Sequence, residues 1–312
     1  MKRIRNISNK IGVLIILIIT GCSNHNKVES HITGFDISPD GKYIVYSFGE
    51  DKQSASLYQS QIDGGNPKII AKDSSYSFFN PKFSKDGNTI IFVGNNEKNK
   101  KSSIWEVDKN GLSLKKIFED SGFISEVIYS DYTKAIYFIK ANVYDSYSPI
   151  APKAKHDFDI YALDNNDFKP KKISAMAAYS LASLIEVDKD KILIGVRGDE
   201  ADSGIFFYHK DSKKVEKIVT TNDTLTNSTG YLNPVVLDDG NIICASYYEL
   251  VSIDLKSKLD EMILPSSGYH FRDIRYNKKL HKIFFARQDR TDDIYITDLD
   301  GENLKEVTLV KK

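Results

Sequence analysis

Cysteine is nearly absent from this chain, which has only Cys22 and Cys244 among its 312 residues. Two cysteines are too few for a disulfide framework or for the paired cysteines of a structural zinc site. Other enzyme signatures are missing too, because the sequence has no G-x-S-x-G elbow, no H-E-x-x-H motif and no P-loop. Cys244 lies in the apolar run NIICAS, as expected of a small buried residue. The fold must therefore be held together by its hydrophobic core.

An excess of charge of either sign is also absent. The chain has 43 basic and 43 acidic residues. Residues 1–21 contain four basic residues and no acid, so the rest of the chain has 39 basic against 43 acidic residues, a charge near −4. Nonspecific binding of nucleic acid depends on clustered positive charge. We therefore expect no nucleic-acid partner.

What the sequence does contain is a repeat. A triad of mostly β-branched, aromatic or other apolar residues occurs six times, at spacings of 41 to 56 residues. The six copies begin at Ile44, Ile90, Ile136, Ile192, Ile242 and Ile283. Each triad follows a strand-like piece and a tight turn, and it precedes another strand-like piece and a short basic and apolar segment. Four short strands joined by turns predict one antiparallel meander in each copy.

Six such meanders predict an all-β fold, a six-bladed β-propeller of four-stranded antiparallel blades. A single four-stranded sheet cannot cover both of its faces, whereas sheets stacked around a ring can. A β-sandwich is the alternative, but it does not predict a four-strand unit that recurs six times. We expect the propeller to occupy residues 32–312, and residues 27–33 could add an outer strand to the last blade.

The turn of the first copy carries a family resemblance. Residues 38–48, SPDGKYIVYSF, resemble the WD-like repeats of the TolB propeller family, in which SPDG links the two innermost strands of a blade. The match is clear in the first two copies and weaker in the fourth and sixth, which lack the Asp-Gly pair. This resemblance implies a propeller and an extracytoplasmic setting, but it does not imply the partners of TolB itself.

The first residues have the pattern of a bacterial lipoprotein leader. A basic start precedes the apolar run Ile11–Ile19, which is shorter than the roughly 20 residues that span a bilayer. The next residues, Ile19-Thr20-Gly21-Cys22, resemble the lipobox, in which the Cys becomes N-terminal and lipid-modified. An ordinary secretory signal with a chance cysteine is the alternative. We expect a signal peptide over 1–21, a lipidated Cys22 that begins a polar tether over 22–31, and a cell-membrane, extracytoplasmic location.

The third copy departs most from the repeat. From the triad to the third strand it takes 24 residues, against 8 to 14 in the other copies. This connection lies on the propeller face that commonly binds ligands, so its extra residues are candidates for recognition. The candidate partner-binding residues are Tyr144, Asp145, Tyr147, His156, Asp157 and Asp159. A loop that caps the channel and packs on its own side chains is the alternative interpretation.

A metal site at His156, Asp157 and Asp159 is weakly indicated, since strand alternation would place the histidine opposite the two aspartates. We therefore predict no metal, no cofactor and no catalytic residue. The predicted function is a monomeric, membrane-anchored propeller that binds an envelope protein or a surface ligand. The alternative is a carbohydrate- or peptide-active enzyme with its site at the channel mouth, which acids and histidines converging there would favour.

The leader generates the first testable prediction. Two acyl chains on Cys22 should hold the protein stably at a membrane, because each buried CH₂ contributes about 0.8 kcal/mol. Mass spectrometry of the membrane fraction should find diacylglycerol on Cys22, and Cys22→Ala should move the protein to the soluble fraction. A variant that fractionates like the wild type would contradict the lipid anchor.

Overall fold

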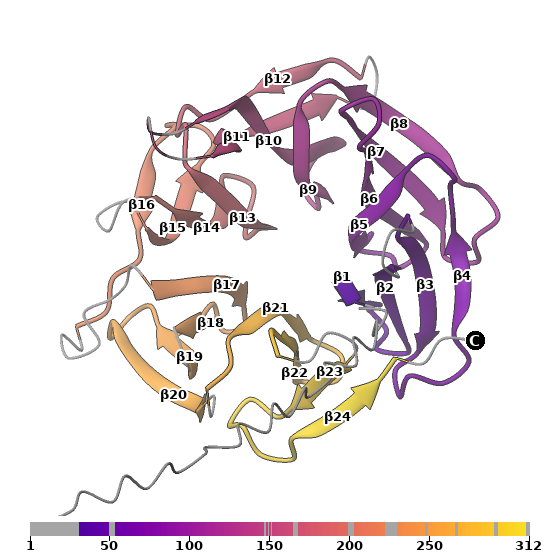
Figure 1. Cartoon of the computed structure of the whole chain (residues 1–312). Coiled ribbons are helices and arrows are strands. Elements are labelled where there is room, and N and C mark those ends of the chain that lie inside the picture. Colours follow the sequence, from indigo (N-terminus) through magenta and orange to yellow (C-terminus); the bar gives the residue numbers. More distant parts are fainter. Residues whose placement is uncertain are drawn as a thin grey trace, which may run out of the picture.

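The computed structural model describes residues 31–49, 54–146, 148, 150, 152–164, 168–198, 203–221, 230–246, 249–265, 268–289 and 293–309. These residues form six four-stranded antiparallel sheets arranged around a central axis (Figure 1). Each sheet consists of four consecutive strands, and we number these blades 1 to 6 in chain order. The predicted all-β, six-bladed propeller is thereby confirmed.

The innermost strand of each blade comes first in the chain. Blades 1 to 3 consist of β1 (His31–Ile37), β2 (Tyr43–Gly49), β3 (Ser56–Gln61), β4 (Lys68–Ala71); β5 (Ser77–Phe83), β6 (Thr89–Asn96), β7 (Lys101–Asp108), β8 (Lys115–Asp120); β9 (Phe123–Tyr129), β10 (Ala135–Ser146), β11 (Lys153–Asp164) and β12 (Pro170–Lys172). Blades 4 to 6 consist of β13 (Ser180–Glu186), β14 (Lys191–Arg197), β15 (Gly204–His209), β16 (Val215–Lys217); β17 (Tyr231–Val236), β18 (Ile242–Ser246), β19 (Glu249–Asp254), β20 (Leu259–Pro265); β21 (Phe271–Asn277), β22 (Lys282–Arg287), β23 (Asp293–Thr297) and β24 (Lys305–Thr308).

The SPDG turn links β1 to β2, as the sequence predicts. The Ser38 hydroxyl donates to Oδ1 of Asp40 at 2.7 Å, and Gly41 has a φ of 70°, a conformation that favours glycine. Blade 2 repeats the arrangement, with the Ser84 hydroxyl 2.6 Å from Oδ1 of Asp86. Within each turn, the serine hydroxyl and the aspartate carboxylate thus form the same local contact.

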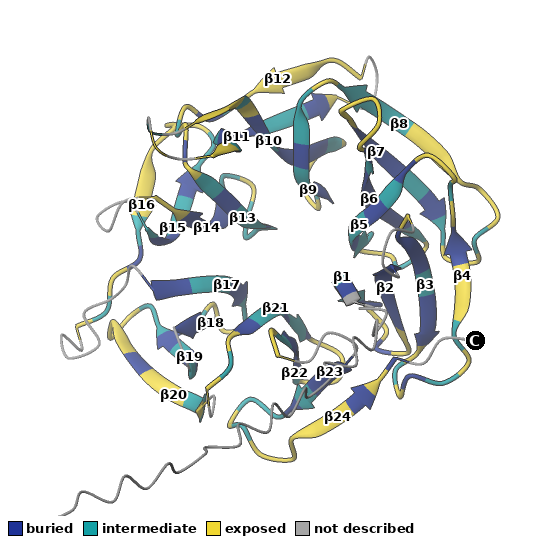
Figure 2. Ribbon diagram, viewed as in Figure 1, coloured by how far each residue is buried: buried dark blue, intermediate teal, exposed yellow. Residues whose placement is uncertain are grey.

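The hydrophobic core lies between blades. Six clusters of buried apolar side chains occur among the described residues, one at each boundary between neighbouring blades. At the boundary between blades 6 and 1, for example, Phe35 and Tyr46 share a cluster with Phe284 and Ile294. Figure 2 shows the result, with largely buried middle strands and exposed stretches on the outermost strands. Each fully buried large apolar side chain contributes roughly 1.5–3 kcal/mol, so every blade is stabilised chiefly by its two neighbours.

Ring closure uses packing and hydrogen bonds. Residues 31–33 belong to β1, the innermost strand of blade 1, so they do not form an outer strand on the last blade as suggested above. Instead, the side chains of β21 reach across to β1. Nε of Arg275 donates to the Phe35 carbonyl at 3.0 Å, and Nδ2 of Asn277 donates to the Ser38 carbonyl at 2.9 Å.

Neighbouring blades are also joined near the axis by side chains of the innermost strands. Oδ2 of Asp36 in blade 1 accepts from the Phe83 N–H of blade 2 at 2.8 Å. The carboxylate of Glu126 in blade 3 accepts the backbone N–H groups of Ser183 and Leu184 in blade 4, at 2.8 and 2.9 Å. These carboxylates therefore satisfy backbone donors that burial between the blades removes from water.

Local backbone geometry supports this arrangement. The innermost strands of blades 1, 2, 4, 5 and 6 each carry a bulge with one residue in positive φ. In blade 1 this residue is Gly34, with a φ of 131°, and a Cβ there would lie 2.4 Å from Oδ1 of Asn80 in blade 2. Glycine is thus required at this position by both its backbone and its neighbour. Asn80 in turn donates from Nδ2 to the Ser125 carbonyl of blade 3 at 2.8 Å.

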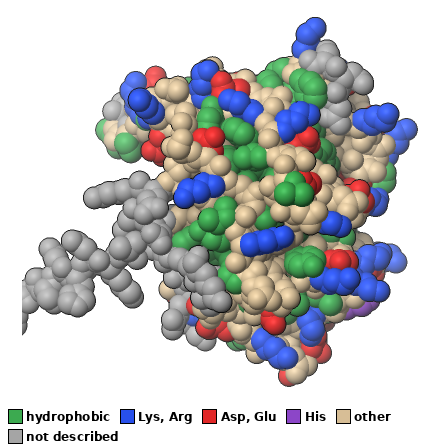
Figure 3. All heavy atoms as spheres, turned by 90° about the vertical axis from the view of Figure 1, so that its right-hand side faces the viewer, with side chains coloured by type: hydrophobic (Ala, Val, Ile, Leu, Met, Phe, Trp, Pro, Cys, Tyr) green, Lys and Arg blue, Asp and Glu red, His purple; other side chains and the backbone are tan. Residues whose placement is uncertain are grey.

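The surface carries both signs of charge. On the side where β4 and β8 lie, lysines and arginines alternate with acidic side chains, with hydrophobic side chains between them (Figure 3). Among the residues described, no helix is long and apolar enough to cross a membrane. The predicted signal peptide, Cys22 and the tether up to residue 30 lie outside the described residues, whereas residue 31, the predicted end of the tether, belongs to β1.

One lysine, Lys82 of β5, is partly buried near the axis. Burial lowers its pKa to about 8, and the positive charge of Arg275 lowers it further, against the opposite effect of Asp36, Glu126 and Asp273. These five side chains come from the innermost strands of blades 1, 2, 3 and 6. The axis therefore holds a mixed cluster of charges that belong to four blades.

Lys82 generates the second prediction. Its folded-state pKa of about 8 lies below the ordinary value of 10.5, so the unfolded chain holds the proton more tightly between these two values. The contribution of Lys82 to the free energy of unfolding should therefore rise as the pH rises through about 8. Urea unfolding at about pH 7 and pH 9 measures the free energy of unfolding of Lys82→Met and of wild type. The difference in favour of Lys82→Met should be smaller at pH 9. The exposed Lys98→Met is the control, and a pH-independent difference for Lys82→Met would contradict the prediction.

Candidate functional site

The insertion in the third copy forms a β-ribbon. Strands β10 and β11 each have 12 residues and pair continuously from Ala135 opposite Asp164 to Ser146 opposite Lys153. The second and third strands of the other blades have 5 to 8 residues. The extra residues therefore lengthen a hairpin that the blade already contains, and most of the predicted loop is regular strand.

The predicted recognition residues fall into two groups along this ribbon. At the tip, Tyr144 is 65% exposed, and the Asp145 carboxylate lies 3.4 Å from Nζ of Lys153. The Ser146 N–H and Lys153 together lower the pKa of Asp145, so this tip keeps a negative charge next to its lysine. Tyr147 lies outside the described residues.

At the base of the ribbon the side chains turn inward. His156 is buried, and its Nδ1 lies 2.9 Å from Oδ1 of Asp157. Asp157 has a φ of 57°, which interrupts the alternation of the strand, and its carbonyl accepts from Nδ2 of Asn142 at 2.5 Å. The base residues therefore contact one another, while the tip residues face solvent.

Asp159 is fully buried, and all its contacts are internal. Its Oδ1 accepts from the Ser174 hydroxyl at 2.8 Å and from the Met176 N–H at 2.7 Å, and its Oδ2 lies 2.5 Å from Nζ of Lys172. These partners belong to β12 and to the segment that follows it, residues 173–179, which we call the link because it joins blade 3 to blade 4. Asp159 therefore positions the link and does not reach the surface where a partner would bind.

Phe158 secures the same segment through its backbone. Its N–H donates to the Ala178 carbonyl at 2.8 Å, and its carbonyl accepts from the Ala178 N–H at 3.1 Å. The link is thus attached on one side to the base of the ribbon. Its other side lines a pocket.

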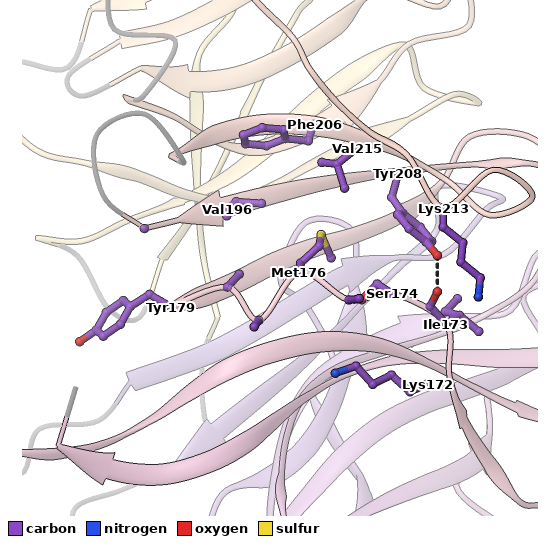
Figure 4. Close-up of a pocket in the computed structure, with 14 residues that line it drawn as sticks. Lys172, Ile173, Ser174, Met176, Tyr179, Val196, Phe206, Tyr208, Lys213 and Val215 are labelled. Atoms are coloured by element: carbon purple, nitrogen blue, oxygen red, sulfur yellow. Dashed lines mark hydrogen bonds between the residues drawn. The ribbon is translucent and has the colours of Figure 1, made fainter.

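This pocket has a volume of about 590 Å³ and lies between the link and blade 4 (Figure 4). The link contributes Ile173 and Met176, and blade 4 contributes Val196, Phe206 and other apolar side chains. Figure 4 shows Tyr179 and Val196 at one end, and Tyr208 and Lys213 at the other. No motif in the sequence predicts this pocket. The signal that the sequence offered was the run of small residues in the link, SAMAA, over residues 174–178.

The described residues do not fit a metal centre. They contain no group of three or more His, Cys, Asp or Glu side chains that could hold a metal ion. The two ring nitrogens of His209 lie 3.2 Å from Oδ2 of Asp190 and 3.1 Å from Oε2 of Glu216, so both contact carboxylates of blade 4. Cys244 is buried in the cluster between blades 4 and 5, and burial raises its pKa well above its ordinary value.

These features define a six-bladed β-propeller with a ribbon on blade 3 and a pocket beside it. No protein-family model matches the sequence. No curated protein matches it either. Solved structures do resemble it: TolB from Acinetobacter baumannii has a TM-score of 0.63 at 14% identity, over 86% of this chain and 64% of that one. The fold is thus a TolB-like propeller, and the chain spans less than two thirds of the TolB chain.

Proteins of other functions share the fold. An oligogalacturonate lyase in complex with manganese gives a TM-score of 0.60 at 11% identity, over 90% of this chain and 78% of that one. The propeller domain of the Trilobed protease from Pyrococcus furiosus, which has an open velcro topology, gives a TM-score of 0.54 at 16% identity. The match covers 91% of this chain and 96% of that one. At these identities the similarity concerns the fold alone, which hosts unrelated functions.

The buried carboxylate generates the third prediction. Asp159→Ala should lower the free energy of unfolding by roughly 2 kcal/mol, because hydrogen bonds to a buried charged group are lost and the link loses its attachment. Asp145→Ala, in the same ribbon but exposed, is the matched control and should change it by less than about 1 kcal/mol. Urea unfolding of both variants measures the difference, and equal effects would show that Asp159 does not support the link.

Proposed function

We propose that this protein is a lipid-anchored, extracytoplasmic propeller that binds an envelope protein or a surface ligand through the tip of the blade 3 ribbon. The observation that carries the proposal is the ribbon itself. In the other five blades the second and third strands have 5 to 8 residues, against 12 in β10 and β11, so the blade does not require the extra length. A regular structure that the scaffold does not need is a candidate for function.

The chemistry of the tip supports a recognition role. Tyr144 is 65% exposed and Ile150 is 97% exposed, close to a pair of opposite charges at Asp145 and Lys153. Exposed apolar and aromatic side chains with a polar rim are typical of protein interfaces, in which tyrosine is enriched. The ribbon strands hold Tyr144, Asp145 and Lys153 in a regular arrangement, which lowers the entropy lost on binding.

The anchor is supported by the sequence and by the fold. The residues Ile19-Thr20-Gly21-Cys22 follow a short apolar run, as in lipoproteins, and a TolB-like propeller is in keeping with an extracytoplasmic setting. A protein held at a membrane by its N-terminus would meet membrane-bound partners at high local concentration, so modest affinity at the tip would suffice.

Charges near the axis bear on the alternative, an enzyme with its site at the channel mouth. The described charges there are engaged in holding blades together: Asp36 binds the Phe83 N–H and lies 3.5 Å from Arg275, and Glu126 binds two N–H groups of blade 4. The lowered pKa of Lys82 is the observation that favours catalysis, because many reactive lysines have a lowered pKa. Because the axial carboxylates are engaged between blades, we favour binding.

The ribbon generates the fourth prediction. Replacing residues 143–155 with Gly-Asn-Gly removes the tip and keeps Phe158 and Asp159, which attach the link. Because loop length changes closure entropy only slowly, the melting temperature should stay within about 4 °C of wild type. Mild crosslinking in cells should then recover the partner with wild type and lose it with the shortened ribbon.

Point variants sharpen this experiment. Tyr144→Ala should weaken partner binding by about 2 kcal/mol if the tyrosine is a buried anchor in the complex. Tyr132→Ala is the control, because Tyr132 is an exposed tyrosine of the same blade in the turn at the opposite end of β10. If the shortened protein unfolds, the ribbon is a structural cap. If it folds and still captures the partner, the binding surface lies elsewhere.

A further inference from the structure

The pocket between blades 3 and 4 has the size and the apolar character of a ligand site. Its volume of about 590 Å³ falls in the range of about 300–1,000 Å³ that small-molecule sites occupy. Most of its lining is apolar. The apolar and aromatic lining residues are Ile173, Ala175, Met176, Ala177, Ala178, Tyr179, Val196, Phe206, Tyr208 and Val215. A hydrocarbon chain would therefore be favoured along the pocket.

The charges at the pocket have one sign. Among its described lining residues only Lys172 and Lys213 are charged, and both are basic. Lys172 is already neutralised by Asp159, which raises the pKa of Lys172 through a hydrogen bond. Lys213 is exposed and makes no ion pair with any described residue. One cationic group is thus available to a ligand, at the end of the pocket next to Tyr208 (Figure 4).

Glu216, the acid next to Val215 in β16, faces away from the pocket. Strand alternation points Phe206 and Tyr208 of β15 into it, so the intervening Phe207 lines a different cavity on the other face of blade 4. Glu216 lines that other cavity as well, and it lies beside His209. An anionic group at Lys213 would therefore meet no carboxylate among the described residues of the pocket lining.

The wall of the pocket is already built. The Tyr208 hydroxyl donates to the Ile173 carbonyl, which ties the link to blade 4 at the basic end. Burial, together with the charges of Asp159 and Asp190, raises the pKa of Tyr208 and keeps this hydroxyl protonated. On its far side the link is held by Asp159 and Phe158. A ligand would enter a pocket whose two walls are joined before binding, which reduces the ordering it must impose.

We propose that this pocket binds a single-chain anionic amphiphile of the fatty-acid class. The hydrocarbon chain lies between Met176 of the link and Phe206 of blade 4, and the carboxylate pairs with Lys213. This site is separate from the ribbon tip, and it does not depend on the proposed partner or on the lipid anchor.

Isothermal titration calorimetry with lauric acid, below its micellar concentration, tests the site on the full chain carrying Cys22→Ala. Laurate should bind with saturation at one site per chain. Laurylamine, which has the same chain and a cationic head, should bind at least about tenfold more weakly, because Lys213 repels it. Lys213→Gln should weaken laurate by about fivefold, within the range of an exposed ion pair. Its matched control is Lys214→Gln, at the neighbouring exposed lysine outside the pocket lining. This variant should leave the affinity for laurate unchanged.

A second pair of variants tests where the hydrocarbon chain of the ligand lies. Val215→Glu places a carboxylate in the lining at a residue that is 44% exposed, so the fold should tolerate it. Ile69→Glu is the control, on the outermost strand of blade 1 with 49% exposure. Laurate binding should be lost in the first and kept in the second. No saturable binding of laurate, equal binding of laurate and laurylamine, or equal binding by the two glutamate variants would overturn the proposal.

Discussion

The packing of each blade against its two neighbours is the interaction on which the rest of this structure depends. A four-stranded sheet has two faces, and neither is buried until another sheet covers it. The six clusters of buried apolar side chains meet this need, one at each boundary between blades. The outermost strands are the most exposed, and only some of their side chains, such as Ile70 of β4 and Val307 of β24, reach these clusters.

Inter-blade packing also sets what the inner strands can do. Where blades converge on the axis, their backbones lose access to water, and carboxylates such as Asp36 and Glu126 accept the N–H groups of the next blade. These charges are compensated by Arg275 and Lys82, so the axis is held by contacts that cross blade boundaries. Acidic residues near a propeller axis are often read as catalytic, and here they have a structural task.

The departures from the regular blade described here lie on blade 3 and at its boundary with blade 4. The ribbon extends β10 and β11 beyond the blade, and its base holds the link through Phe158 and Asp159. The link then forms one wall of the pocket against Phe206 and Tyr208. A single insertion thus accounts for an exposed tip and a supported pocket wall, while the ring itself keeps its regular geometry.

Much of the fold follows from sequence alone, because the strands and turns of each blade are specified by residues that are close together in the chain. Period, turn residues and alternation predict six four-stranded blades, the SPDG turn between innermost strands and a buried Cys244, and the structure confirms them. The position of the insertion was also evident. That it continues two strands was not, because loop and ribbon differ only in cross-strand pairing.

Tertiary structure decided which residues of the candidate site are available. Asp159 and Tyr144 are both plausible recognition residues in sequence, but one is fully buried and the other 65% exposed. The pocket joins residues that no period relates, and ring closure brings together residues far apart in the chain, as when Arg275 bonds the Phe35 carbonyl across 240 positions. Local sequence determines the blade because its strands are neighbours in the chain. Only closure of the ring determines what the first and last blades share, and only packing between blades creates the pocket.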